Sequence, residues 1–101
     1  MSNVKISEEG IEDCRNMCKA AGLAYFGFEC PMGEYVHCEC SSILKANEAV
    51  DMQKCQTFNT ASGAHCSGPF SITTNIGTYD MGAGGLNSAY AVEPTTSGIS
   101  F

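Results

Sequence analysis

The chain has 101 residues, a net charge of −6 and seven cysteines, which suits one small domain with a single core. No Lys or Arg occurs after Lys54, which argues against nucleic acid as a partner because phosphate binding requires basic groups. No apolar run approaches the roughly 20 residues of a membrane span. Residues Met1 to Gly10 lack the apolar stretch of a signal peptide, so we expect a mature or excised fragment.

The first predicted element is a helix from Ser7 to Ala21. Ser7 is a suitable N-cap, the acidic Glu8 and Glu9 suit the positive end of the helix dipole, and Gly22 is a suitable terminator. Apolar side chains recur at steps of three and four and form one helical stripe. The stripe consists of Ile11, Cys14, Cys18 and Ala21.

A hairpin of two alternating strands is predicted to follow. The strands are Leu23 to Cys30 and Tyr35 to Cys40, and the turn is Pro31-Met32-Gly33-Glu34. We expect the helix to cover the apolar face, which carries Ala24, Phe26, Phe28, Cys30, Val36, Cys38 and Cys40. The opposite face carries Tyr25, Gly27, Glu29, Tyr35, His37 and Glu39. The predicted fold class is therefore a small disulfide-rich α+β domain with one main helix packed on an antiparallel sheet.

Two disulfides are predicted to join this helix to this sheet. Residues four apart on a helix rise roughly 6 Å, and residues two apart on a strand rise roughly 6.6 Å. Cys14 and Cys18 can therefore face Cys38 and Cys40 as two parallel rungs. The spacing does not decide which cysteine pairs with which. Disulfides in so small a domain are typical of proteins outside the cytosol.

The second half of the chain gives weaker signals. A short helix is predicted over Asn47 to Cys55, and a polar connection over Gln56 to Gly68 whose loop a Cys55–Cys66 disulfide would close. The remaining segments are a strand-like stretch with a Gly77 break, a glycine-rich turn, a returning strand and a polar tail. They span Pro69 to Tyr79, Met81 to Gly85, Leu86 to Val92 and Glu93 to Phe101. We expect one domain over residues 1–92 and a flexible tail over 93–101.

The order of these motifs over residues 11–92 resembles the WSC domain, a cysteine-rich module of fungal cell-wall stress sensors. The matching segments are Cys14 to Cys18, Gly22 to Glu29, His37-Cys38-Glu39-Cys40, Cys55, His65-Cys66-Ser67-Gly68 and Ala83 to Tyr90. The chain lacks the family's cysteine before the helix and has Ala83 in place of another, but gains Cys30. The odd total predicts that Cys30 is unpaired or bonded to another molecule, although Cys30 could also displace any of the predicted partners.

The resemblance implies a PAN/apple-like architecture and an extracellular, secreted or cell-surface module that binds cell-wall or matrix glycans, without a catalytic centre or cofactor. Saccharide recognition needs flat apolar rings and planar amides or carboxylates. Tyrosine supplies the rings here because the chain has no Trp. The predicted polysaccharide-binding residues lie beside the glycine turn and are Tyr79, Asp80, Asn87 and Tyr90.

Three alternatives compete with this interpretation. Zinc could use the sulfur and imidazole groups of His37, Cys38, Cys40, His65 and Cys66, but Cys-x-Cys and Cys-x-x-x-Cys are uncommon zinc spacings, so no metal is expected. A Cys-His nucleophile is disfavoured because adjacent residues on a strand point to opposite faces. The remaining alternative is a structural subunit that associates with copies of itself in an extracellular assembly, with O-linked sugars on its Thr/Ser-bearing tail.

Overall fold

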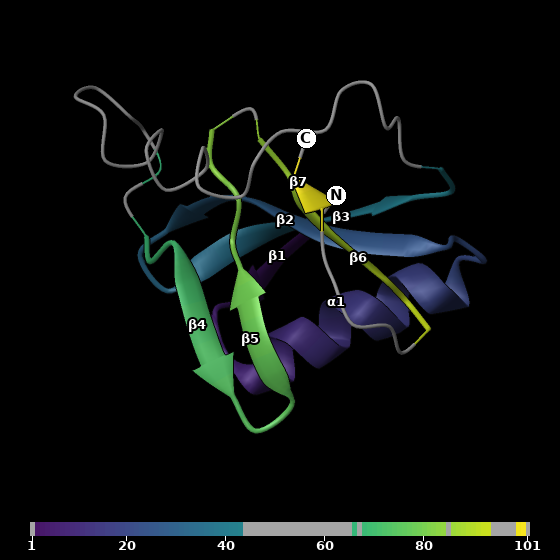
Figure 1. The fold of residues 1–101 in the computed structure, drawn as a ribbon, viewed down its shortest axis with the longest axis horizontal. Coiled ribbons are helices and arrows are strands. Elements are labelled where there is room, and N and C mark those ends of the chain that lie inside the picture. The colour runs from purple at the N-terminus through teal and green to yellow at the C-terminus, as the bar shows by residue number, and fades with distance from the viewer. Residues whose placement is uncertain (1, 44–65, 67, 85, 94–98, 101) are drawn as a thin grey trace.

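The computed structural model describes residues 2–43, 66, 68–84, 86–93 and 99–100. It contains one helix packed against one face of a five-stranded antiparallel sheet, with a separate two-stranded hairpin beside them (Figure 1). The predicted fold class is confirmed. The described elements in chain order are β1 (Ser2–Lys5), α1 (Glu8–Ala20), β2 (Tyr25–Met32), β3 (Tyr35–Ser41), β4 (Ser71–Thr74), β5 (Gly77–Asp80), β6 (Ser88–Ala91) and β7 (Ile99–Ser100).

Helix α1 begins and ends close to the predicted residues. Ser7 is the N-cap, and its side chain accepts a hydrogen bond from the Gly10 amide at 3.1 Å. At the other end Gly22 adopts φ +77°, and the Leu23 amide donates to the Cys18 carbonyl at 3.1 Å. This pattern is a Schellman motif, which requires a residue that tolerates a left-handed conformation.

The five strands of the main sheet lie in the order β1-β3-β2-β6-β7. The predicted hairpin forms its centre, with Phe28 opposite Cys38 and Phe26 opposite Cys40. Strand β6 returns along the other side of β2, as the predicted strand over Leu86 to Val92 required. Strand β1 was not predicted, and it pairs with β3 so that Val4 lies opposite Val36.

The core lies between α1 and the sheet. It combines Ile11, Cys14 and Cys18 of the helix stripe with alternate residues of β2 and β3, as the two periodicities predicted. Ala21 and Ala24, also predicted to face the core, are exposed because they lie beyond the end of α1 and before the start of β2. The hairpin of β4 and β5 closes one side of it through Ile72 and Tyr79. Its turn also reaches the start of the helix, since the Asn75 amide donates to the Glu8 carboxylate at 2.9 Å. Buried core residues include Ile11, Cys14, Cys18, Phe26, Phe28, Val36, Cys38 and Met81.

The end of β2 departs from the prediction. The strand does not stop at Cys30 but continues to Met32, after a bulge between Glu29 and Met32. Cys30 adopts φ +55°, which is uncommon for a residue with a side chain. Bulges of this kind re-aim a side chain. Cys30 therefore does not follow the alternation that predicted its side chain to lie on the core face.

Several predictions for the second half fall only partly on described residues. The short helix over Asn47 to Cys55 lies outside them, as does most of the polar connection that follows. The tail predicted over 93–101 contains β7, which pairs with β6. The main sheet therefore extends into a segment whose composition suggested no strand.

Candidate functional site

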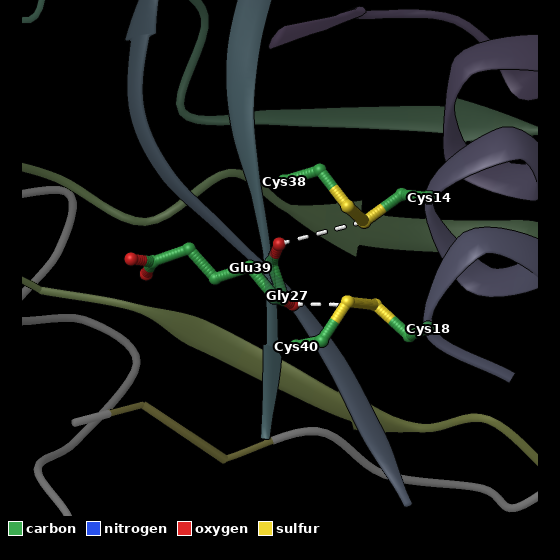
Figure 2. Close-up of a disulfide and its surroundings, with 6 residues drawn as sticks. All are labelled: Cys14, Cys18, Gly27, Cys38, Glu39 and Cys40. Carbon is green, nitrogen blue, oxygen red and sulfur yellow. Dashed lines mark hydrogen bonds between the residues drawn. A yellow bond between two sulfur atoms is a disulfide. The ribbon is translucent and has the colours of Figure 1, made fainter. Parts of the chain in front are cut away.

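Two disulfides join the helix to the sheet as predicted, and the structure supplies the pairing that spacing left open. Cys14 bonds to Cys38 with a Cα–Cα distance of 5.6 Å, and Cys18 bonds to Cys40 with a distance of 5.3 Å. Figure 2 shows them as two parallel rungs from successive turns of α1 to alternate residues of β3. The Sγ atoms of Cys14, Cys18 and Cys38 lie within 4.8 Å of one another.

The surroundings of these sulfurs suit disulfides better than a metal. The Cys14 Sγ lies 3.7 Å from the Gly27 carbonyl oxygen, and the Cys18 Sγ lies 3.6 Å from that of Glu39. A disulfide sulfur carries no hydrogen, so these are van der Waals contacts. The same carbonyl dipoles would repel the thiolates that zinc requires. His37 cannot join the sulfurs, because it lies opposite Glu29 on the other face of the sheet, and His65 is outside the described residues.

The third disulfide corrects the sequence prediction. Cys66 bonds to Cys30, with a Cα–Cα distance of 4.9 Å, and not to Cys55. The prediction that Cys30 is the unpaired cysteine is therefore wrong, and by count Cys55 is the odd one. The physical reason is the bulge in β2, which turns Cys30 away from the core face toward the segment that contains Cys66.

Three of the four residues predicted to bind glycans come together. The Tyr79 and Tyr90 rings meet edge to face with centroids 5.0 Å apart, and both also contact the Phe26 ring. The Asp80 amide donates to the Tyr90 hydroxyl at 2.8 Å. Burial raises the pKa of the Asp80 carboxyl. The tyrosine rings of this cluster therefore pack on the core, and less of their surface remains for a ligand.

Asn87, the fourth predicted residue, lies on the other face of the sheet. Ala89 is directly opposite Gly27, and Asn87 shares its face because it precedes Ala89 by two residues. Its side chain rests on Gly27, where an added Cβ would come within 2.5 Å of Oδ1. That oxygen is buried and has no hydrogen-bond partner. The structure thus separates Asn87 from Tyr79, Asp80 and Tyr90.

The face of the sheet away from α1, which we term the outer face, gathers the polar residues of the central hairpin. Glu29 lies directly opposite His37, and Glu39 lies opposite Gly27. Glu29 is the diagonal cross-strand neighbour of Glu39 on this face. Burial, followed by the neighbouring Glu29 charge, raises the pKa of Glu39 to about 7.

Tyrosines flank these carboxyl groups on the outer face. Tyr25 is half-buried, whereas Tyr35 is 53% exposed. Figure 2 shows the Glu39 side chain leaving β3 on the side opposite the disulfides. The alternation in the sequence already assigned these residues to the face away from the helix. The signal that it missed was the glycine opposite Glu39, on which the Asn87 side chain rests.

Two acidic residues in the first half of α1, Glu8 and Glu12, have structural partners. Glu8 accepts from the Asn75 amide, and Glu12 forms an ion pair with Arg15 at 3.3 Å. Arg15 also donates to the Val92 carbonyl at 2.7 Å. This side of the helix is thus a solvated surface that ties α1 to neighbouring segments.

Among the described residues, no helix combines the length and apolar character needed to cross a bilayer. Comparisons with protein-family models, curated proteins and solved structures find no match to this chain. Its three disulfides fit a protein of an oxidising compartment. The function of the chain is therefore inferred from its own surfaces.

Proposed function

We propose that the chain is a non-catalytic, extracellular carbohydrate-binding module of the WSC type, which recognises a cell-wall or matrix glycan. The observation that carries the proposal is the outer face, where two tyrosines flank a pair of neighbouring glutamates. Sugars present an apolar ring face and a rim of hydroxyls, so they need an aromatic surface beside polar groups. Tyr25 and Tyr35 supply the first, and Glu29, Glu39 and His37 supply the second.

The disulfides support this role by making the surface rigid without occupying it. Both rungs lie on the helix side of the sheet, so they anchor β3 without contacting its outer face. A preorganised surface loses less conformational entropy when it binds. The net charge of −6 directs the choice of ligand toward neutral saccharides, because uronate or sulfate groups would be repelled.

Retention of the oxidised monomer on insoluble polysaccharides tests the proposal. Tyr35→Ala should weaken retention about tenfold, since an aromatic stacking contact contributes about 1 kcal/mol. Tyr35 is 53% exposed, so its loss should leave folding intact. Ile76→Ala is the matched control, because Ile76 is 41% exposed but lies in the turn between β4 and β5.

Two outcomes would change the assignment. If no polysaccharide or glycan array retains the folded domain, carbohydrate binding is wrong. If Asp80→Asn abolishes retention and Tyr35→Ala does not, the ligand lies at the Tyr79, Asp80 and Tyr90 cluster that the sequence favoured. Asp80 is a fair target for this comparison because its backbone amide bonds to the Tyr90 hydroxyl, so it adjoins this cluster.

A second candidate function is assembly with copies of itself. Met32 and Tyr35 lie opposite each other at the end of the central hairpin, and they are 51% and 53% exposed. Such neighbouring apolar groups favour contact with another protein surface. An odd number of cysteines adds a means of covalent linkage. Gel electrophoresis with and without reductant, together with sedimentation, separates the two functions, because a glycan-binding monomer runs at one size.

A further inference from the structure

The two tyrosines of the outer face stand at opposite ends of the central hairpin. Tyr25 lies opposite Ser41, whereas Tyr35 lies opposite Met32. Six positions of β3 separate Tyr35 from Ser41. At a rise of about 3.4 Å per residue, the two tyrosines are therefore about 20 Å apart along the strands. A single sugar ring cannot contact both of them.

The cross-strand rows between the tyrosines carry polar side chains. Glu39 lies opposite Gly27, and Glu29 lies opposite His37. These three polar side chains are half-buried, as is that of Asn87, which rests on Gly27. Their carboxyl, imidazole and amide groups are of the kinds that form hydrogen bonds with sugar hydroxyls. The order along the strands is therefore aromatic, polar, polar and aromatic.

Neither Tyr25 nor Tyr35 belongs to the ring cluster that packs on the core. Within the described part of the chain, the ring contacts join four other residues, which are Phe26, Phe28, Tyr79 and Tyr90. Tyr35 is 53% exposed, and Tyr25 is half-buried. Both tyrosines thus keep some accessible surface, on which the apolar face of a sugar can stack.

We propose that the outer face binds an extended internal segment of a β-1,4-linked polysaccharide, with about five consecutive sugar units between and including those on Tyr25 and Tyr35. This inference rests on the proposed function and adds the class of ligand. The tyrosine separation of about 20 Å equals about four steps of an extended pyranose chain, at about 5 Å per step. A β-1,4-linked chain turns alternate units to opposite sides, so its first and fifth units present the same face to the sheet. A β-1,3-linked chain coils and does not keep those two units on one face.

The dependence of affinity on ligand length tests this inference. The oxidised monomer is titrated calorimetrically with β-1,4-linked glucose and N-acetylglucosamine oligosaccharides of two to six units. Affinity should increase in a step at about five units, where the ligand first reaches the second tyrosine. The step should lower Kd about tenfold, which is the effect expected of one more stacked ring.

Paired variants separate a ligand that spans both tyrosines from one that uses either. With the six-unit ligand, Tyr25→Leu and Tyr35→Ala should each weaken binding about tenfold, and the double variant about a hundredfold, because distant sites contribute additively. With the two-unit ligand, each single variant should lose only about half of the binding, because the remaining tyrosine still binds. Leucine keeps apolar bulk at the half-buried position of Tyr25. Ile76→Ala is the matched control and should leave both affinities unchanged, since Ile76 is exposed in the turn between β4 and β5.

The outcomes distinguish this inference from the proposed function. Affinity that does not increase beyond three units overturns the extended site but leaves carbohydrate binding standing. A folded Tyr25→Leu variant that binds the six-unit ligand as the wild type does has the same meaning, and so does stronger binding of β-1,3-linked than of β-1,4-linked hexamers. The length series uses the wild type alone, so it decides the question even if Tyr25→Leu unfolds. If neither the oligosaccharides nor the insoluble polysaccharides bind, both proposals are wrong.

Discussion

Removing the disulfide rungs should reveal that their contributions are strongly non-additive. Closing the loop between Cys14 and Cys38, at a sequence separation of 24, contributes about 3.4 kcal/mol by chain entropy. Once it is closed, the Cys18–Cys40 bond closes only a ring of roughly six residues and adds about 2.2 kcal/mol. Removing either rung while the other remains should thus cost about 2.2 kcal/mol, and removing both should cost about 5.6 kcal/mol.

The third disulfide provides the comparison. Cys30 and Cys66 are separated by 36 residues, and neither rung shortens that loop, so its loss should cost about 3.8 kcal/mol. Removing one rung should therefore cost less than removing the Cys30–Cys66 bond, although Cys14–Cys38 is the more buried bond.

Urea unfolding of paired alanine variants measures these differences. Alanine avoids burying an unpaired hydroxyl, and a Cys55→Ser background prevents exchange with the odd thiol. Loss of buried sulfur adds a further roughly 1 kcal/mol to each variant and leaves the ranking intact. The reasoning is refuted if the variant without both rungs loses only twice what each single variant loses, or if the Cys30–Cys66 bond contributes least. The variants are Cys14→Ala/Cys38→Ala, Cys18→Ala/Cys40→Ala, their combination, and Cys30→Ala/Cys66→Ala.

Three other predictions concern the helix cap, a buried turn and the odd cysteine. Ser7→Ala should lower the free energy of unfolding by about 1 kcal/mol through loss of the N-cap bond, and an unchanged urea midpoint would contradict the cap. Gly82→Ala should lower the free energy of unfolding by at least about 2 kcal/mol more than Gly22→Ala does. Both glycines have positive φ, but only at Gly82 would an added Cβ collide with the Phe28 carbonyl. Equal decreases in melting temperature for the two glycine variants would refute this prediction. Thiol titration of the denatured, non-reduced monomer should find one thiol per chain, absent in Cys55→Ser; a value of three or more would mean that a disulfide is open.

The parts of the fold that could be predicted from the sequence are those that depend on local signals. Ser7 and Gly22 bound the helix because capping depends on single residues with known preferences. The rungs were predictable because helix and strand rises alone bring Cys14 and Cys18 opposite Cys38 and Cys40. In each case the evidence lies within a few residues of the feature that it specifies.

The missed features depend on contacts that the local pattern does not encode. Alternation places Cys30 on the core face, but the bulge in β2 turns its side chain away from that face. The bulge is stabilised by tertiary contacts, such as the hydrogen bond that the Cys30 amide donates to the Ala83 carbonyl at 3.2 Å. Strand β1 has one buried residue, Val4, which is too little for a periodic signal. For the candidate site, residue type identified Tyr79 and Tyr90, but only packing showed that their rings contact Phe26.

The strands at the two edges of the main sheet limit how copies of this molecule can associate. The described edge strands of the main sheet are β1 and β7, which have four and two residues, and Lys5 adds a charge on β1. Short, charged edges give an incoming strand few backbone groups to pair with, so they oppose continuous β-sheet growth between molecules. If this protein builds fibres or coats, they should lack the 4.7–4.8 Å cross-β repeat and remain insensitive to amyloid dyes.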